Sequence, residues 1–94
     1  MIEGTRKITI SSIGSSKVLF FDSNDKSHKV KYFYDKRGLT FFRFRGNVYY
    51  IQFVPSMECY LAYIKISDRF FLASRGYKDH VVEFGNTRGF LRRQ

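Results

Sequence analysis

The sequence predicts a mainly β fold, a small curled antiparallel sheet or barrel, with one short helix if residues 55–64 are helical. Aromatic residues make up 19% of the 94 residues, and aromatic side chains favour strands. Short apolar segments recur between turns rich in Gly, Ser, Asn and Asp, as in small all-β domains. We expect residues 1–87 to form one β-rich domain and residues 88–94 to be a mobile basic tail.

The expected strands follow one another along the chain and are separated by these turns. They are residues 7–13, 17–21, 29–34, 39–45, 48–54, 69–73 and 81–84. A bulge at Gly38 would shift the register of the third strand by one residue and exchange its faces. Either Tyr32 or Phe33 therefore joins the solvent-facing side.

The segment after Pro55 fits two structures. Apolar residues at positions 57, 60, 61 and 64 follow the spacing of one helix face, and proline fits the first turn of a helix. Alternation at positions 60, 62, 64 and 66 instead fits a strand. We favour the short helix, because Pro followed by Ser, Met and Glu is a poor start to a central strand.

Residues 39–54 read as a hairpin with a two-residue turn at Gly46-Asn47, since both residue types tolerate positive φ. That turn would pair Phe44 with Tyr49 and give one apolar face, which is suited to the core. The opposite face carries rings and guanidinium groups: Phe41, Arg43, Arg45 and Tyr50. The alternative is that these rings are buried beneath a second sheet or a partner.

The formal net charge is +9, from 17 basic and 8 acidic residues, which predicts attraction to polyanions. Arginine neutralises phosphates and aromatic rings stack on bases. We therefore expect a non-catalytic nucleic-acid-binding domain for RNA or single-stranded DNA, because no base-reading recognition helix is visible. The candidate binding residues are Phe41, Arg43, Arg45 and Tyr50 on the sheet, with Arg88, Arg92 and Arg93 in the tail.

Two other classes of function fit the composition. The first is a protein–protein interaction module, such as a viral or mobile-element inhibitor or accessory factor docking on a larger partner. Exposed edge strands would also allow a homodimer. The second is a small basic ribonuclease using His28 and His80, although no nucleophile elbow or Gly-rich phosphate loop accompanies them. We favour a protein that is not an enzyme.

Cysteine and histidine usage predicts neither a disulfide nor a metal site. Cys59 is the only cysteine, and two isolated histidines lack the spacing of metal ligands. We expect no cofactor. The first ten residues do not resemble a secretory signal and no apolar run is long enough to span a membrane, so we expect a cytoplasmic protein with no membrane partner.

Several short motifs between residues 30 and 77 resemble the KTSC domain, a module named for the C-terminus of some lysyl-tRNA synthetases. They are Tyr34-Asp35, Leu39, Phe41, Gly46, Val48-Tyr49 and Val54-Pro55. Ile51 stands where that family's pattern has a second tyrosine. The resemblance implies a small β-rich domain with one helix that opens at Val-Pro, and an RNA-binding role.

Overall fold

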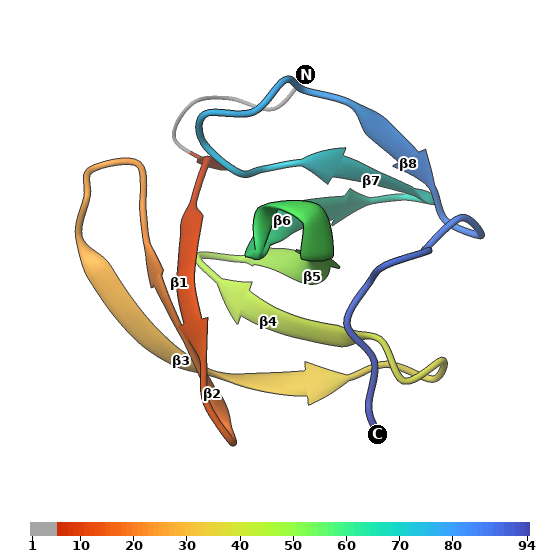
Figure 1. Ribbon diagram of the computed structural model, residues 1–94, viewed down its shortest axis with the longest axis horizontal. Coiled ribbons are helices and arrows are strands. Elements are labelled where there is room, and N and C mark those ends of the chain that lie inside the picture. Colours follow the sequence, from red (N-terminus) through yellow and green to blue (C-terminus); the bar gives the residue numbers. More distant parts are fainter. Residues whose placement is uncertain (1–5) are drawn as a thin grey trace.

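Eight antiparallel strands follow one another as a meander in the computed structural model, which describes residues 6–94 (Figure 1). The strands are β1 Thr9–Ile13, β2 Lys17–Phe21, β3 Ser27–Tyr34, β4 Thr40–Phe44, β5 Asn47–Val54, β6 Cys59–Ile66, β7 Arg69–Leu72 and β8 Val81–Glu83. This confirms the mainly β fold class. The expected domain also included residues 1–5, which lie outside the described residues.

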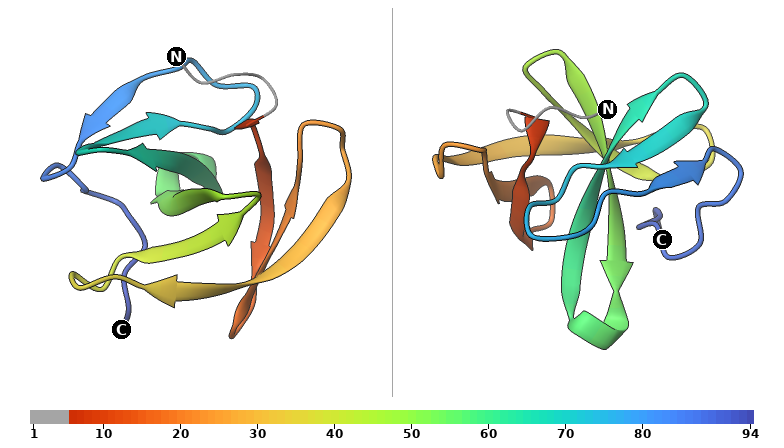
Figure 2. Two further views of the ribbon diagram at one scale, coloured as in Figure 1. Left: turned by 180° about the vertical axis from the view of Figure 1, so that it is seen from behind. Right: turned by 90° about the horizontal axis from the view of Figure 1, so that it is seen from above.

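The sheet curls until the start of β1 meets the segment that follows β7, as the views in Figure 2 show. Strand β3 makes the bend, because its first five residues pair with β2 and its last three with β4. Ahead of β1, the backbone N–H of Ile8 donates to the carbonyl of Ala73 at 2.7 Å. The resulting parallel bridge between Ile8 and Ser74 joins the first strand to the end of β7.

Strands β5 and β6 are buried on both faces, so residues 6–94 contain two hydrophobic clusters. The inner core is Ile8, Ile10, Val18, Phe20, Phe42, Tyr49, Ile51, Ala62, Ile64 and Ala73. The outer core, on the opposite face, is Leu39, Tyr50, Leu61, Tyr63, Phe70, Leu72 and Phe90. Successive side chains of a strand point to opposite faces, so neighbours such as Tyr49 and Tyr50 belong to different cores.

The predicted helix over residues 55–64 is wrong. Pro55–Met57 form a single 3-10 turn, Glu58 adopts a left-handed φ of 49°, and β6 begins at Cys59. Because β6 lies between β5 and β7, its apolar residues face both cores. A strand buried on both sides carries a nearly continuous apolar run, and that run produced the apparent helical spacing.

The predicted hairpin has the correct faces but the wrong register. Its turn residues are Arg45 and Gly46, with φ values of 51° and 80°, so Phe44 pairs with Asn47 and Phe42 with Tyr49. The turn lies one residue earlier on both strands, which moves each pairing by two positions. A shift of two preserves the alternation of faces, so Phe41 and Arg43 still lie opposite to the inner core.

Residues 89–93 are packed against the sheet, against our expectation of a mobile tail. The carbonyl of Leu91 accepts from the N–H of Thr40 at 2.8 Å, and its own N–H donates to the carbonyl of Ile51 at 2.7 Å. These bonds lie just beyond the last pair of the β4–β5 ladder, Phe41 with Tyr50. The C-terminal segment is therefore inserted between the start of β4 and the end of β5, which have separated there.

Candidate functional site

The solvent-facing side of β3 carries two lysines and a phenylalanine in alternation. Lys29, Lys31 and Phe33 are exposed, whereas the intervening Val30 and Tyr32 pack against the inner core. The sequence left open which of Tyr32 and Phe33 faces solvent. The register places Phe33 there, directly opposite Phe41 on β4.

Phe33, Phe41 and Arg43 form one contiguous surface. The ring centroids of Phe33 and Phe41 are 6.0 Å apart, and the Arg43 guanidinium lies 5.1 Å from the centre of Phe41 and 6.0 Å from that of Phe33. Phe33 is 45% exposed. Lys29 and Lys31 lie on the same face of β3 as Phe33. We call the five residues together the basic–aromatic strip: Lys29, Lys31, Phe33, Phe41 and Arg43.

The cations of the strip have no acidic partner among residues 6–94. A third lysine, Lys17 on β2, lies directly opposite Lys31, and Lys29 is the next residue on the same face of β3. Like charges directly opposite each other destabilise a sheet. An anionic ligand would offset this repulsion.

A pocket of about 310 Å³ adjoins the lysine end of the strip. It is lined by Ser12, Gly14, Ser15, Ser16, Lys17, Leu19 and Lys29. Hydroxyl and ammonium groups are phosphate donors, so this pocket extends the strip with polar contacts. The serine-rich run of residues 11–16, which covers the end of β1 and the turn before β2, was the sequence signal for the pocket, but such a run is equally typical of an ordinary loop.

Tyr50, a predicted site residue, does not join the strip. Its side chain is only 4% exposed, and its ring packs between Phe41 and Phe70, with centroid distances of 5.4 and 5.0 Å. Burial, aided by the charge of Asp35, raises the pKa of Tyr50 to about 12, and its hydroxyl donates to Asp35 Oδ2 at 3.1 Å. Tyr50 packs beside Phe41 as its cross-strand partner and has no free face for a base.

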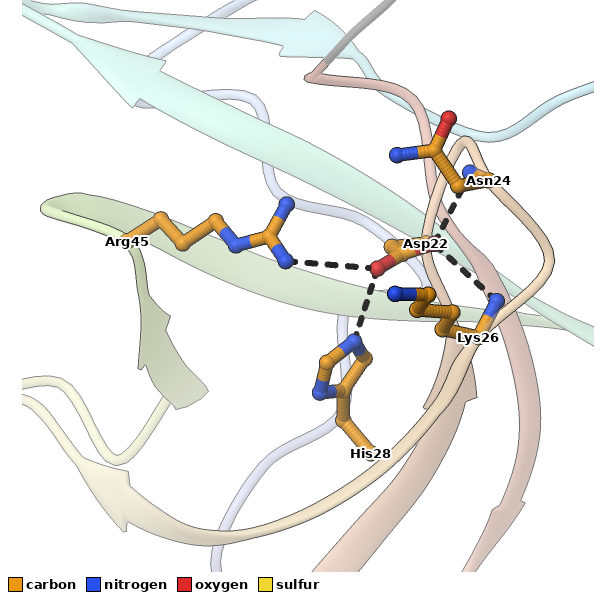
Figure 3. A network of polar contacts seen from close by, with 5 residues as sticks. All are labelled: Asp22, Asn24, Lys26, His28 and Arg45. Atoms are coloured by element: carbon orange, nitrogen blue, oxygen red, sulfur yellow. Dashed lines mark hydrogen bonds and ion pairs between the residues drawn. The ribbon is translucent and has the colours of Figure 1, made fainter.

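Arg45 also lies apart from Arg43. Its guanidinium is 4.7 Å from the ring centre of Phe44, and its Nη2 is 3.5 Å from Asp22 Oδ2. Phe44 packs against the inner core, so the left-handed turn carries Arg45 to the side opposite the strip. Figure 3 shows it reaching toward Asp22.

The three C-terminal arginines are placed by contacts of their own. Arg92 donates to Thr87 Oγ1 at 2.9 Å, and the Arg93 guanidinium lies 5.7 Å from the ring centre of Tyr34. Arg88 is exposed, and its carbonyl accepts from Gln52 at 3.1 Å. Within residues 6–94, no hydrogen bond or ring contact joins these arginines to the strip.

Asp22 organises the turn between β2 and β3 (Figure 3). Its carboxylate accepts from the backbone N–H groups of Asn24 and Lys26, at 2.8 and 3.1 Å, and lies 2.8 Å from Nε2 of His28. These donors favour the charged carboxylate. The hydrogen bond from His28 is the largest cause, and together they lower the pKa of Asp22 to about 2.

We expect acid to destabilise the protein through Asp22. The unfolded carboxyl has a pKa of about 3.9, so the stability it contributes is fully present above that value. It is lost as the pH falls toward the folded pKa of about 2. Urea unfolding midpoints measured between pH 6 and pH 2 would show the decline. In Asp22→Asn the decline between pH 4 and pH 2 should be smaller, and an unchanged decline would contradict this assignment.

The two histidines have separate partners. His28 faces Asp22 and stacks on Phe20 at 5.3 Å, whereas the Nε2 of His80 lies 2.7 Å from the Tyr63 hydroxyl. Within residues 6–94, no three His, Cys, Asp or Glu side chains are grouped as a metal site requires. No helix in this part of the chain is long and apolar enough to cross a membrane.

Comparison with protein-family models, with curated proteins and with solved structures finds no match. The resemblance to the KTSC domain stays a prediction from the sequence.

Proposed function

We propose that this protein binds single-stranded nucleic acid, RNA or DNA, without catalysis, through the basic–aromatic strip. One observation carries the proposal: the exposed ring of Phe33 lies beside the Arg43 guanidinium and continues a row of exposed lysines on the same face of β3. A strand that crosses this face meets a surface for its bases and cations for its phosphates.

The two kinds of group do different work in such a complex. Lys29, Lys31 and Arg43 neutralise phosphates and release counterions, which makes the affinity fall as salt rises. Phe33 offers a flat apolar surface on which an unpaired base stacks, with Phe41 behind it. Stacking needs an exposed base face, which a single strand has and a duplex hides. The strip therefore favours single strands over duplexes.

Replacing Phe33 with alanine should weaken single-strand binding about tenfold, since one stacked base contributes about 1–3 kcal/mol. The slope of log affinity against log salt should stay unchanged, because no cation is removed. The measurement is a fluorescence titration of labelled single-stranded RNA, single-stranded DNA and duplex DNA over a salt series. Duplex binding should not respond to this substitution.

Phe53→Ala is the matched control. Phe53 is also an exposed ring, at 37%, but its side chain lies on the face of β5 that carries Tyr49 and Ile51 rather than on the strip. Its removal should leave binding unchanged. Equal losses in Phe33→Ala and Phe53→Ala would overturn the proposal. A salt-insensitive, stoichiometric complex with a protein would favour the interaction-module alternative.

A further inference from the structure

A second cationic pocket, built around Phe84, lies on the outer-core side of the sheet. It has a volume of about 270 Å³ and is lined by Asp35, Lys36, Arg37, Tyr50, Lys65 and Phe84. The Arg37 guanidinium is 4.0 Å from the centre of the Phe84 ring, and the Lys65 ammonium is 4.5 Å from the same centre. The Phe84 ring thus lies close to two positively charged groups. We call this site the Phe84 pocket.

The pocket is preorganised by the outer core. Phe84 stacks on Phe70 with an interplanar angle of 11° and a centroid distance of 5.6 Å, and Phe70 is fully buried. Arg37 Nη1 also donates to the carbonyl of Phe84 at 3.0 Å. The ring and the guanidinium are therefore fixed relative to the core before any ligand arrives, which lowers the entropic cost of binding.

The cations around the pocket lack a counter-ion. Within the described part of the chain, Lys36, Arg37 and Lys65 form no ion pair. The one carboxylate in the lining, Asp35, already accepts from the Tyr50 hydroxyl and from the backbone N–H groups of Arg37 and Leu39. The pocket therefore carries three positive side chains and one carboxylate, and the oxygens of that carboxylate already accept hydrogen bonds from other groups.

We propose that the Phe84 pocket binds a phosphate group. Phosphate oxygens accept short charge-assisted hydrogen bonds from guanidinium and ammonium groups, and the negative charge would offset the repulsion between Arg37 and Lys65. Tyr50 lines the pocket and contacts Phe41 of the strip at 5.4 Å. A strand on the strip would pass close enough to place a phosphate there, and this source of the phosphate rests on the proposed function.

The first test is titration of the labelled protein with inorganic phosphate, followed by NMR. We expect the backbone resonances of residues 35–37, 65 and 84 to shift, and sodium chloride of equal ionic strength not to shift them. Lys65→Met keeps the apolar stem but removes the charge, and should weaken phosphate binding about tenfold because one charge-assisted hydrogen bond is lost. Arg37→Gln is a second variant with the same expected loss.

Lys78→Met is the control, because Lys78 is an exposed lysine that does not line the pocket. An equal response of Lys65→Met and Lys78→Met, or equal shifts with chloride, would overturn the pocket. Phe33→Ala separates the two proposals. If this variant loses strand binding but keeps the phosphate response, phosphate binding in the Phe84 pocket does not depend on strand binding at the strip. Competition between an oligonucleotide and phosphate identifies the strand as the source, and lack of competition identifies a free phosphate compound.

Discussion

Replacing Phe90 with alanine is expected to lower the free energy of unfolding by about 3–5 kcal/mol, the cost of truncating a buried aromatic ring. Phe90 is 5% exposed and packs at centroid distances of 5.0 Å against both Tyr63 and Phe70. Its loss leaves a cavity in the outer core. It also weakens the attachment of the C-terminal segment between β4 and β5. Urea unfolding followed by circular dichroism gives the value directly.

Two further variants make this result specific. Phe53→Ala truncates a ring that is 37% exposed and should cost less than Phe90→Ala, since a partly exposed ring loses less buried apolar area. Phe90→Leu keeps most of the buried volume and should recover much of the loss. A loss in Phe90→Ala no larger than in Phe53→Ala would mean that the C-terminal segment does not hold the outer core together.

Removing all three cations of the strip, by Lys29→Gln, Lys31→Gln and Arg43→Gln together, is expected to have the largest effect on binding. Each phosphate contact to a single strand contributes about 0.7 to the slope of log affinity against log salt, so the slope should fall by about 2. Affinity at low salt should fall about a hundredfold or more. The measurement is the same oligonucleotide titration at four or more salt concentrations.

A matched variant keeps overall charge from explaining the result. Lys26→Gln, Arg69→Gln and Lys78→Gln also remove three positive charges, but from exposed residues outside the strip. Long-range attraction alone would weaken binding equally in both triple variants. If the strip binds the strand, this second variant keeps nearly the full salt slope. Equal slopes in the two triple variants would contradict the proposed interface.

The sequence predicted the fold class and the faces of the β4–β5 hairpin, because both depend on local alternation and turn chemistry. It placed the turn one residue too late, because Gly46-Asn47 and Arg45-Gly46 are adjacent pairs and each contains a glycine, which tolerates positive φ. Arg45 accepts a left-handed φ of 51° where its guanidinium meets Asp22 and Phe44. Those contacts come from a distant turn and from packing, which local propensity does not describe.

The candidate site was also predicted only in part, because contacts between distant residues decide which side chains stay exposed. Phe41 and Arg43 lie on the predicted face. The strand pairing adds Phe33, whose orientation the sequence left open because it depended on a bulge at Gly38. Tyr50 shares that face but is covered by Phe70 from β7, a contact between residues distant in sequence. Burial by distant segments is not visible in a local pattern, so the sequence identified the face and not which part of it stays open.

The insertion of residues 89–93 between β4 and β5 also has a consequence for biosynthesis. These residues leave the ribosome after every strand that they join, so the gap they fill stays open while the rest of the sheet is already available to fold. Until residues 89–93 emerge, the backbone groups of Thr40 and Ile51 that bond to Leu91 have no partner from this segment. Unpaired strand edges invite pairing with other chains, so we expect the nascent chain to be prone to aggregation until residues 89–93 emerge and pair with β4 and β5.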